Sequence, residues 1–94
     1  MLTFENNQLK ITGAVVIDSA RALFEEGRGY CVANDVTVDF SGATELDSSA
    51  LALILEYRRA AESAGKRVSV SNLPASLKTL ADLYGVTELI AATP

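Results

Sequence analysis

The residues best suited to chemistry lie in one short run, Glu45-Leu46-Asp47-Ser48-Ser49, directly ahead of an apolar stretch. Its two carboxylates could serve as a general acid and base, and its two hydroxyls could contact a partner or accept a phosphate. Asp and Ser in this position also satisfy the free N–H groups of a helix's first turn. The run therefore predicts a capped helix N-terminus that presents hydroxyls at the positive end of the helix dipole.

Composition argues against catalysis at this run. The chain has no histidine, so it lacks the usual general base and the commonest metal ligand. It contains no glycine-rich phosphate loop, no CxxC pair and no Ser-His-acid set. Glu45 and Asp47 have no other catalytic group near them in sequence, and capping is the simpler role for them. We expect no enzymatic activity, no cofactor and no metal.

Charge and cysteine content limit the partners and the compartment. The formal net charge is −4 and no basic stripe stands out, which disfavours nucleic-acid binding. Residues 1–7 carry neither a basic segment nor a signal-length apolar run, and no window is long enough to cross a membrane. The lone Cys31 lies among apolar residues, which predicts a core position and a reducing compartment. We expect a cytoplasmic protein that does not insert into a membrane.

Hydrophobic periodicity predicts a single domain over residues 1–94 that begins with two edge strands. Leu2 alternates with Phe4, and Leu9 with Ile11, on either side of an Asn-Asn pair that favours a hairpin turn. A short amphipathic helix follows over residues 20–27. Asp18-Ser19 is its expected N-cap, and Gly27 or Gly29 its expected end.

The middle of the chain predicts a strand, helix, strand unit. Residues 36–40 alternate as a strand that Gly42 should end, residues 49–64 favour a helix closed by Gly65, and residues 67–71 form the next strand. The two strands should be parallel neighbours. Pro74 precedes a helix over residues 75–84, and residues 86–90 fit either a short strand or a helical turn. The product is an α/β fold, a two-layer sandwich of a small mixed sheet covered by three to four helices.

The long second helix carries two apolar faces. One joins Leu51, Ile54 and Leu55 with the stem of Arg58. Leu53 and Tyr57 lie on another side, which Ala60, Ala61 and Ala64 extend. This second face either packs on the third helix or forms an exposed strip for a partner protein.

From residue 36 to residue 51 the sequence resembles the STAS domain family, and the similarity extends over most of the chain. Asp47-Ser48-Ser49 with the following Ala50-Leu51 is its most specific part. The resemblance implies a STAS-like sandwich that binds a partner protein through this loop. In the anti-sigma factor antagonists of the family, the serine in the place of Ser49 is phosphorylated and a kinase docks around it.

Within the family the sequence is most similar to MlaB-like subunits of phospholipid ABC transporters, which support outer-membrane lipid asymmetry and tolerance of solvents such as toluene. Residues 38–41, 47–55 and 80–85 carry this similarity. It implies that Ser48 contacts the transporter's ATPase subunit, and that the protein lies at the inner membrane through this partner. The MlaB-like pattern tends to have glycine where this chain has Ser49, which keeps open the alternative of a phosphorylated anti-sigma factor antagonist. The expected interface comprises Glu45, Asp47, Ser48, Ser49, Leu51, Leu83 and Tyr84, with Ser49, or alternatively Ser48, as a phosphorylation site.

Overall fold

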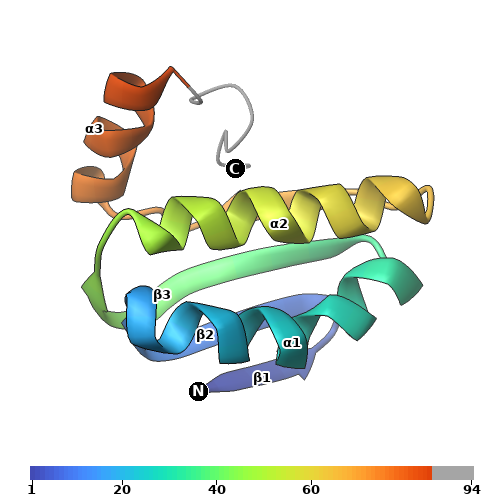
Figure 1. Cartoon of the computed structure of the whole chain (residues 1–94). Coiled ribbons are helices and arrows are strands. Elements are labelled where there is room, and N and C mark those ends of the chain that lie inside the picture. Colours follow the sequence, from blue (N-terminus) through green and yellow to red (C-terminus); the bar gives the residue numbers. More distant parts are fainter. Residues whose placement is uncertain (86–94) are drawn as a thin grey trace.

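The computed structural model of the chain describes residues 1–85. Its elements, in chain order, are β1 (Leu2–Glu5), β2 (Gln8–Val15), α1 (Ile17–Ala33), β3 (Val36–Leu46), α2 (Ser49–Ser63), β4 (Val68–Ser71) and α3 (Ala75–Tyr84). The strands form one mixed sheet in the order β1-β2-β3-β4 (Figure 1). β1 is antiparallel to β2, whereas β2, β3 and β4 are parallel. The predicted α/β class and the β3–α2–β4 crossover are confirmed.

The first hairpin turns at Asn6 and Asn7, whose φ angles are 52° and 62°. Positive φ at both central residues is the geometry of a two-residue hairpin loop, so the predicted hairpin is confirmed. The prediction of two edge strands is wrong for β2, which pairs with β3 from Gln8 to Val15. Gly13, at φ 88°, interrupts the alternation of apolar and polar residues, but β2 continues to Val15. The sequence pattern therefore predicts a strand shorter than β2.

β3 is longer than predicted, because Gly42 does not end it. Gly42 pairs with Thr12 of β2, and the strand continues to Leu46. A Cβ at Gly42 would lie 2.6 Å from the Thr12 methyl carbon Cγ2. The glycine therefore permits a close approach between two strands, and Glu45 lies at the end of a strand instead of in a loop.

α1 also departs from its prediction, since it begins before Asp18 and passes through both Gly27 and Gly29. Gly27 is buried beneath a ring of α2, and a Cβ there would lie 2.5 Å from the Tyr57 hydroxyl oxygen. This glycine lets two helices approach closely; it does not end one. The predicted bounds were too narrow at both ends, because glycine inside a helix is ambiguous without knowledge of its neighbour.

The second half of the chain follows its predictions closely. α2 ends beside Gly65, whose φ is 73°, and α3 ends at Gly85, whose φ is 71°. These left-handed residues are the expected helix-ending glycines. The segment 86–90, for which strand and helical turn were both open, lies outside the described residues.

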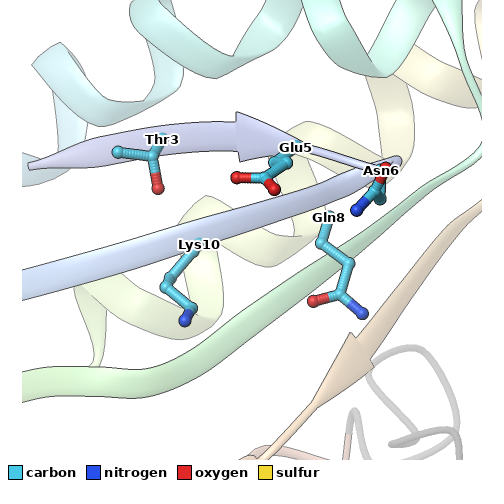
Figure 2. Close-up of a pocket in the computed structure, with 5 residues that line it drawn as sticks. All are labelled: Thr3, Glu5, Asn6, Gln8 and Lys10. Carbon is cyan, nitrogen blue, oxygen red and sulfur yellow. The ribbon is translucent and has the colours of Figure 1, made fainter.

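α1 and α2 cover one face of the sheet, and α3 lies against α2 on the side away from α1 (Figure 1). Buried apolar side chains from the sheet, all three helices and the loop between β4 and α3 form the core: Leu9, Ile11, Val15, Leu23, Cys31, Val36, Val38, Phe40, Ala50, Leu51, Leu53, Ile54, Tyr57, Ala61, Val70, Leu73, Leu77 and Ala81. The other face is polar at its hairpin end, where Figure 2 shows Thr3, Glu5, Asn6, Gln8 and Lys10. This division gives the two-layer sandwich that the sequence predicts.

The second apolar face of α2 packs on α1, in contrast to both sequence-based alternatives. Leu53 and Tyr57 are 3% and 0% exposed. The Tyr57 hydroxyl donates a hydrogen bond to the Leu23 carbonyl of α1, and its ring stacks with Phe24. Periodicity identified the face, but only the three-dimensional order of the helices identifies its neighbour.

Cys31 is fully buried and free, as predicted for a core residue. Burial raises the pKa of its thiol to about 11. None of the helices within residues 1–85 has the length and apolar character needed to span a bilayer.

Candidate functional site

Two strand-to-helix junctions meet at one edge of the sheet. β2 passes into α1 after Val15, and β3 passes into α2 after Leu46. Val15 and Leu46 are paired neighbours, and the Asp47 N–H donates to the Val15 carbonyl at 3.3 Å. Because parallel strands end at the same edge, the first turns of both helices lie together here. The sequence predicted one helix N-terminus at this place, and the structure provides two.

Asp47 caps both of these helices. Its Oδ1 accepts the Ser49 backbone N–H at 2.8 Å, and its Oδ2 accepts the Ile17 backbone N–H at 3.2 Å. The Ser49 backbone bond is the largest influence on the Asp47 pKa, and with the Ser49 hydroxyl and the Ile17 bond it lowers that pKa despite partial desolvation. A carboxylate held ionised in this way suits a cap and is a poor general acid at neutral pH.

The two serine hydroxyls have different environments. Ser49 is half-buried, and its hydroxyl hydrogen-bonds the Asp47 carboxylate. Ser48 is exposed, and its side chain makes no hydrogen bond within residues 1–85. The Ser48 carbonyl accepts the N–H groups of Leu51 and Ala52, at 3.1 and 3.3 Å, which fixes the turn that carries it. Ser48 therefore presents a free hydroxyl on a rigid support.

The structure places the predicted interface residues in different parts of the domain. Asp47, Ser48 and Ser49 form the loop and the helix start described above. Glu45, at the end of β3, is exposed close to Ser48 in the chain. Leu83 and Tyr84 are exposed by 76% and 58% in the last turn of α3. No hydrogen bond or ion pair within residues 1–85 joins those two side chains to the Asp47 region. Leu51 is only 3% exposed, so its prediction as a contact residue is wrong.

Leu51 was misassigned because it follows the loop directly in sequence. In the first turn of α2 its side chain points into the core, where it supports the loop from beneath.

Sequence reasoning missed two residues at this edge. Ile17 is 76% exposed at the start of α1, beside the Asp47 carboxylate. Ser19, which was expected to cap α1 from outside, lies within its first turn. Its hydroxyl accepts the Val16 N–H at 3.0 Å and donates to the Ala14 carbonyl at 2.9 Å. The run Ile17-Asp18-Ser19 signals this helix start in the sequence. The carboxylate that accepts the Ile17 N–H belongs to Asp47, which is 30 residues away.

The described residues show no arrangement for metal binding. Within residues 1–85, no three Cys, Asp or Glu side chains gather as a possible ligand set. The carboxylate at the edge is already engaged by backbone N–H groups. The geometry is that of a preformed, capped surface loop, which is suited to protein contact.

Comparison with known families identifies the family of the chain. The family model described as the MlaB STAS domain matches residues 2–91. The chain belongs to the STAS domain family. STAS domains are generally non-catalytic domains that bind partner proteins, in agreement with the capped loop described above.

The STAS fold also appears among solved structures. The anti-sigma factor antagonist SpoIIAA, in its unphosphorylated form, superposes with a TM-score of 0.72 at 15% sequence identity. The match covers 100% of this chain and 87% of that protein. A search of curated protein sequences returned no match. At this identity the structural match establishes the fold alone.

Proposed function

We propose that this STAS domain is a non-catalytic subunit that binds the ATPase subunit of a phospholipid-trafficking ABC transporter. The observation that carries the proposal is the Ser48 hydroxyl, which is exposed and free of intramolecular hydrogen bonds within residues 1–85. The MlaB description of the matched family supports the class of partner. The subunit stabilises the ATPase and supports its activity, and this partner holds it at the cytoplasmic face of the inner membrane. Its role there is in outer-membrane lipid asymmetry and solvent tolerance.

The proposed surface is centred on the first turn of α2. Ser48 offers a donor and acceptor there, and the exposed Glu45 carboxylate adds a charge at its margin. The Asp47 carboxylate holds the two helix ends together through two backbone N–H groups, so the loop is ordered before binding and loses little entropy on contact. Ser49 supports Asp47 through its own hydroxyl.

The C-terminal turn of α3 supplies the apolar part of the surface. α3 contacts α2, so the exposed Leu83 and Tyr84 belong to the helix next to the loop-bearing one. Exposed Leu and Tyr side chains on a small domain are typical of partner contacts. We propose that the ATPase buries both when it docks on Ser48.

Co-expression with the ATPase subunit of a phospholipid-trafficking ABC transporter from the same genome tests the proposal. Ser48→Arg places a long charged side chain at the centre of the surface and should reduce copurification about tenfold. Ser63→Arg is the matched control, because Ser63 is an exposed serine at the opposite end of the same helix. The control should copurify like the unmodified protein. Both variants should remain folded, with circular dichroism spectra like that of the unmodified protein.

Equal copurification of the Ser48→Arg protein and its control would refute the proposed surface. A second arm uses Tyr84→Asp, which tests the α3 end independently of the loop. If only the Tyr84→Asp variant lost binding, the result would show that the ATPase contacts α3 and does not contact Ser48.

An anti-sigma factor antagonist is the alternative function, and the position of Ser49 favours it. A phosphate on Ser49 would lie beside the Asp47 carboxylate that its hydroxyl now contacts. Two negative groups at this distance repel, so phosphorylation would disturb the Asp47 cap and reshape the loop. This would give a physical basis for release of an anti-sigma factor kinase.

Intact-mass measurement after incubation with a cognate anti-sigma kinase and ATP separates the alternatives. A single added phosphate that is lost in Ser49→Ala, and retained in Ser48→Ala, supports the antagonist. The reverse pattern identifies Ser48 as the modified residue. An unchanged mass removes the antagonist function.

A further inference from the structure

A shallow groove runs along the seam of α1 and α2 on the surface that faces away from the sheet. Its first part, of about 300 Å³, is lined by Ile17, Ala20, Arg21 and Phe24 of α1 and by Ser49, Ala52, Leu53 and Glu56 of α2. A second hollow shares Phe24 and Glu56 with the first and continues towards Arg28, Arg59, Ala60 and Ser63. Because the two hollows share residues from both helices, they form one surface, which we name the α1–α2 groove.

The floor of this groove is apolar, and its lining follows α2 from Ser49 to Ser63. Leu53 is buried at its base and Phe24 is half-buried, whereas Ala20 and Ala52 leave space above them. Ile17 extends the apolar surface at one end, where it is 76% exposed. α2 spans 15 residues, or about 21 Å, which is long enough to accommodate about four turns of a second helix.

The charged lining of the groove has the opposite sign to the chain as a whole. The protein has a net charge of −4, yet the groove is lined by Arg21, Arg28 and Arg59 against the single acidic Glu56. Glu56 pairs with Arg59 at 3.2 Å, and Arg21 pairs with the neighbouring Glu25 at 3.3 Å.

Those two ion pairs are exposed, so they hold their arginines only weakly. Arg28 has no ion pair within residues 1–85. A cationic margin on an acidic domain therefore selects a partner with acidic residues at the edges of its contact surface.

We infer that the α1–α2 groove binds an acidic amphipathic helix of a partner protein. Such a helix carries apolar side chains at positions i, i+3, i+4 and i+7, which fill the groove, and Glu or Asp at its flanks, which pair with the arginines. The groove begins at Ile17 and Ser49, next to the Ser48 loop, and continues along α1 and α2 to Arg28 and Ser63. The inference rests on the apolar floor of this seam and on its arginines, which the ATPase proposal does not use.

The probe is a fluorescein-labelled amphipathic helical peptide of about 16 residues, with leucines at the spacing above and glutamates at the flanks. A matched peptide carries lysine in place of every glutamate. Fluorescence anisotropy should show the acidic peptide binding at least about tenfold more tightly than the basic one. Chemical-shift perturbations of the ¹⁵N-labelled protein should follow the facing sides of α1 and α2.

Two alanine variants locate the binding site. Ala52→Glu places a negative side chain in the groove and should weaken the acidic peptide about tenfold. Ala22→Glu is the matched control, since Ala22 is also exposed on a helix and also has a glutamate four residues later. The control should bind within about twofold of the unmodified protein. Arg28→Glu should weaken the acidic peptide and strengthen the basic one.

Several outcomes would overturn the inference. These are no measurable binding of the acidic peptide, equal binding of the two peptides, or equal weakening by Ala52→Glu and Ala22→Glu. Sedimentation that shows a dimer lost in Ala52→Glu would assign the groove to a second copy of the chain. Tyr84→Asp changes α3, which contributes no residue to the groove, and should leave peptide binding unchanged, so failure of the ATPase proposal and failure of this one are distinguishable.

Discussion

The Asp47 carboxylate accepts the backbone N–H of Ile17, a residue 30 positions earlier in the chain, at 3.2 Å. The same carboxylate accepts the N–H of Ser49 at 2.8 Å. One side chain therefore caps two helices that the sequence treats as separate. A change that displaces the Asp47 carboxylate therefore affects the N-termini of both α1 and α2. The loop that carries Ser48 is coupled in this way to the first turn of α1.

Replacement of Asp47 by alanine should destabilise the domain, because both helices lose a charge-assisted cap. We expect the thermal midpoint to fall by about 4–8 °C. Asp18→Ala is the control, since Asp18 lies in the first turn of α1 and is exposed. Its removal should lower the midpoint by much less. Circular dichroism melts measure both values, and equal losses would contradict a special role for Asp47.

Acid should destabilise the domain through Asp47 and Asp39. Burial tends to raise the Asp39 pKa, but hydrogen bonds from Asn72 and Ser41, together with the nearby Lys10 charge, outweigh burial and lower it. The Asp47 pKa is also lowered. Both groups therefore protonate more readily in the unfolded chain, so their stabilisation is full above about pH 4 and is lost as the pH falls further.

Thermal midpoints measured from pH 7 down to pH 2 test this dependence. The unmodified protein should lose stability below about pH 4, and the Asp39→Asn/Asp47→Asn double variant should show a shallower acid dependence. An identical acid dependence in the two proteins would assign the effect to other carboxylates.

Local signals made the β3–α2–β4 part of the fold predictable. The alternation of Val36 with Val38, the helix-forming run after Ser49 and the glycine at position 65 each act within a few residues of the element they define. The Asp-Ser-Ser loop was predicted for the same reason, because its cap is formed by Asp47 on the N–H of Ser49 two residues later.

α1 could not be predicted correctly, because its determinants are distant in sequence. Its first turn is capped by Asp47, and its interior Gly27 is explained by Tyr57, which is also 30 residues away. Without those partners, Gly27 resembles a helix end. The helix that packs against the Leu53 side of α2 was predicted wrongly for the same reason. The order of the helices depends on the assembled fold and has no local signal in the sequence.

Gly27→Ala should destabilise the domain by about 1–3 kcal/mol, because the added Cβ would lie 2.5 Å from the Tyr57 hydroxyl oxygen. Gly29→Ala is a matched substitution in the same helix, and nothing lies within 4 Å of a Cβ there. It should stabilise the domain by about 0.5–1 kcal/mol through helix propensity. Urea unfolding of the two variants gives both values. Changes of the same sign would show that packing against Tyr57 does not govern Gly27.

The Cys31 thiol should resist modification in the folded protein. It is fully buried, and burial raises its pKa to about 11, so both access and thiolate formation are suppressed at pH 8. Ellman's reagent should react with less than about one tenth of the protein over an hour in buffer, and with all of it in 6 M guanidinium, where the thiol titrates near pH 8.5. Because the folded pKa is raised, Cys31 favours the folded state fully below about pH 8.5, and this contribution declines as the pH rises towards 11. Rapid reaction of the native protein would show that α1 opens from the sheet on that timescale, in conflict with the packing of Leu23 and Cys31 in the core.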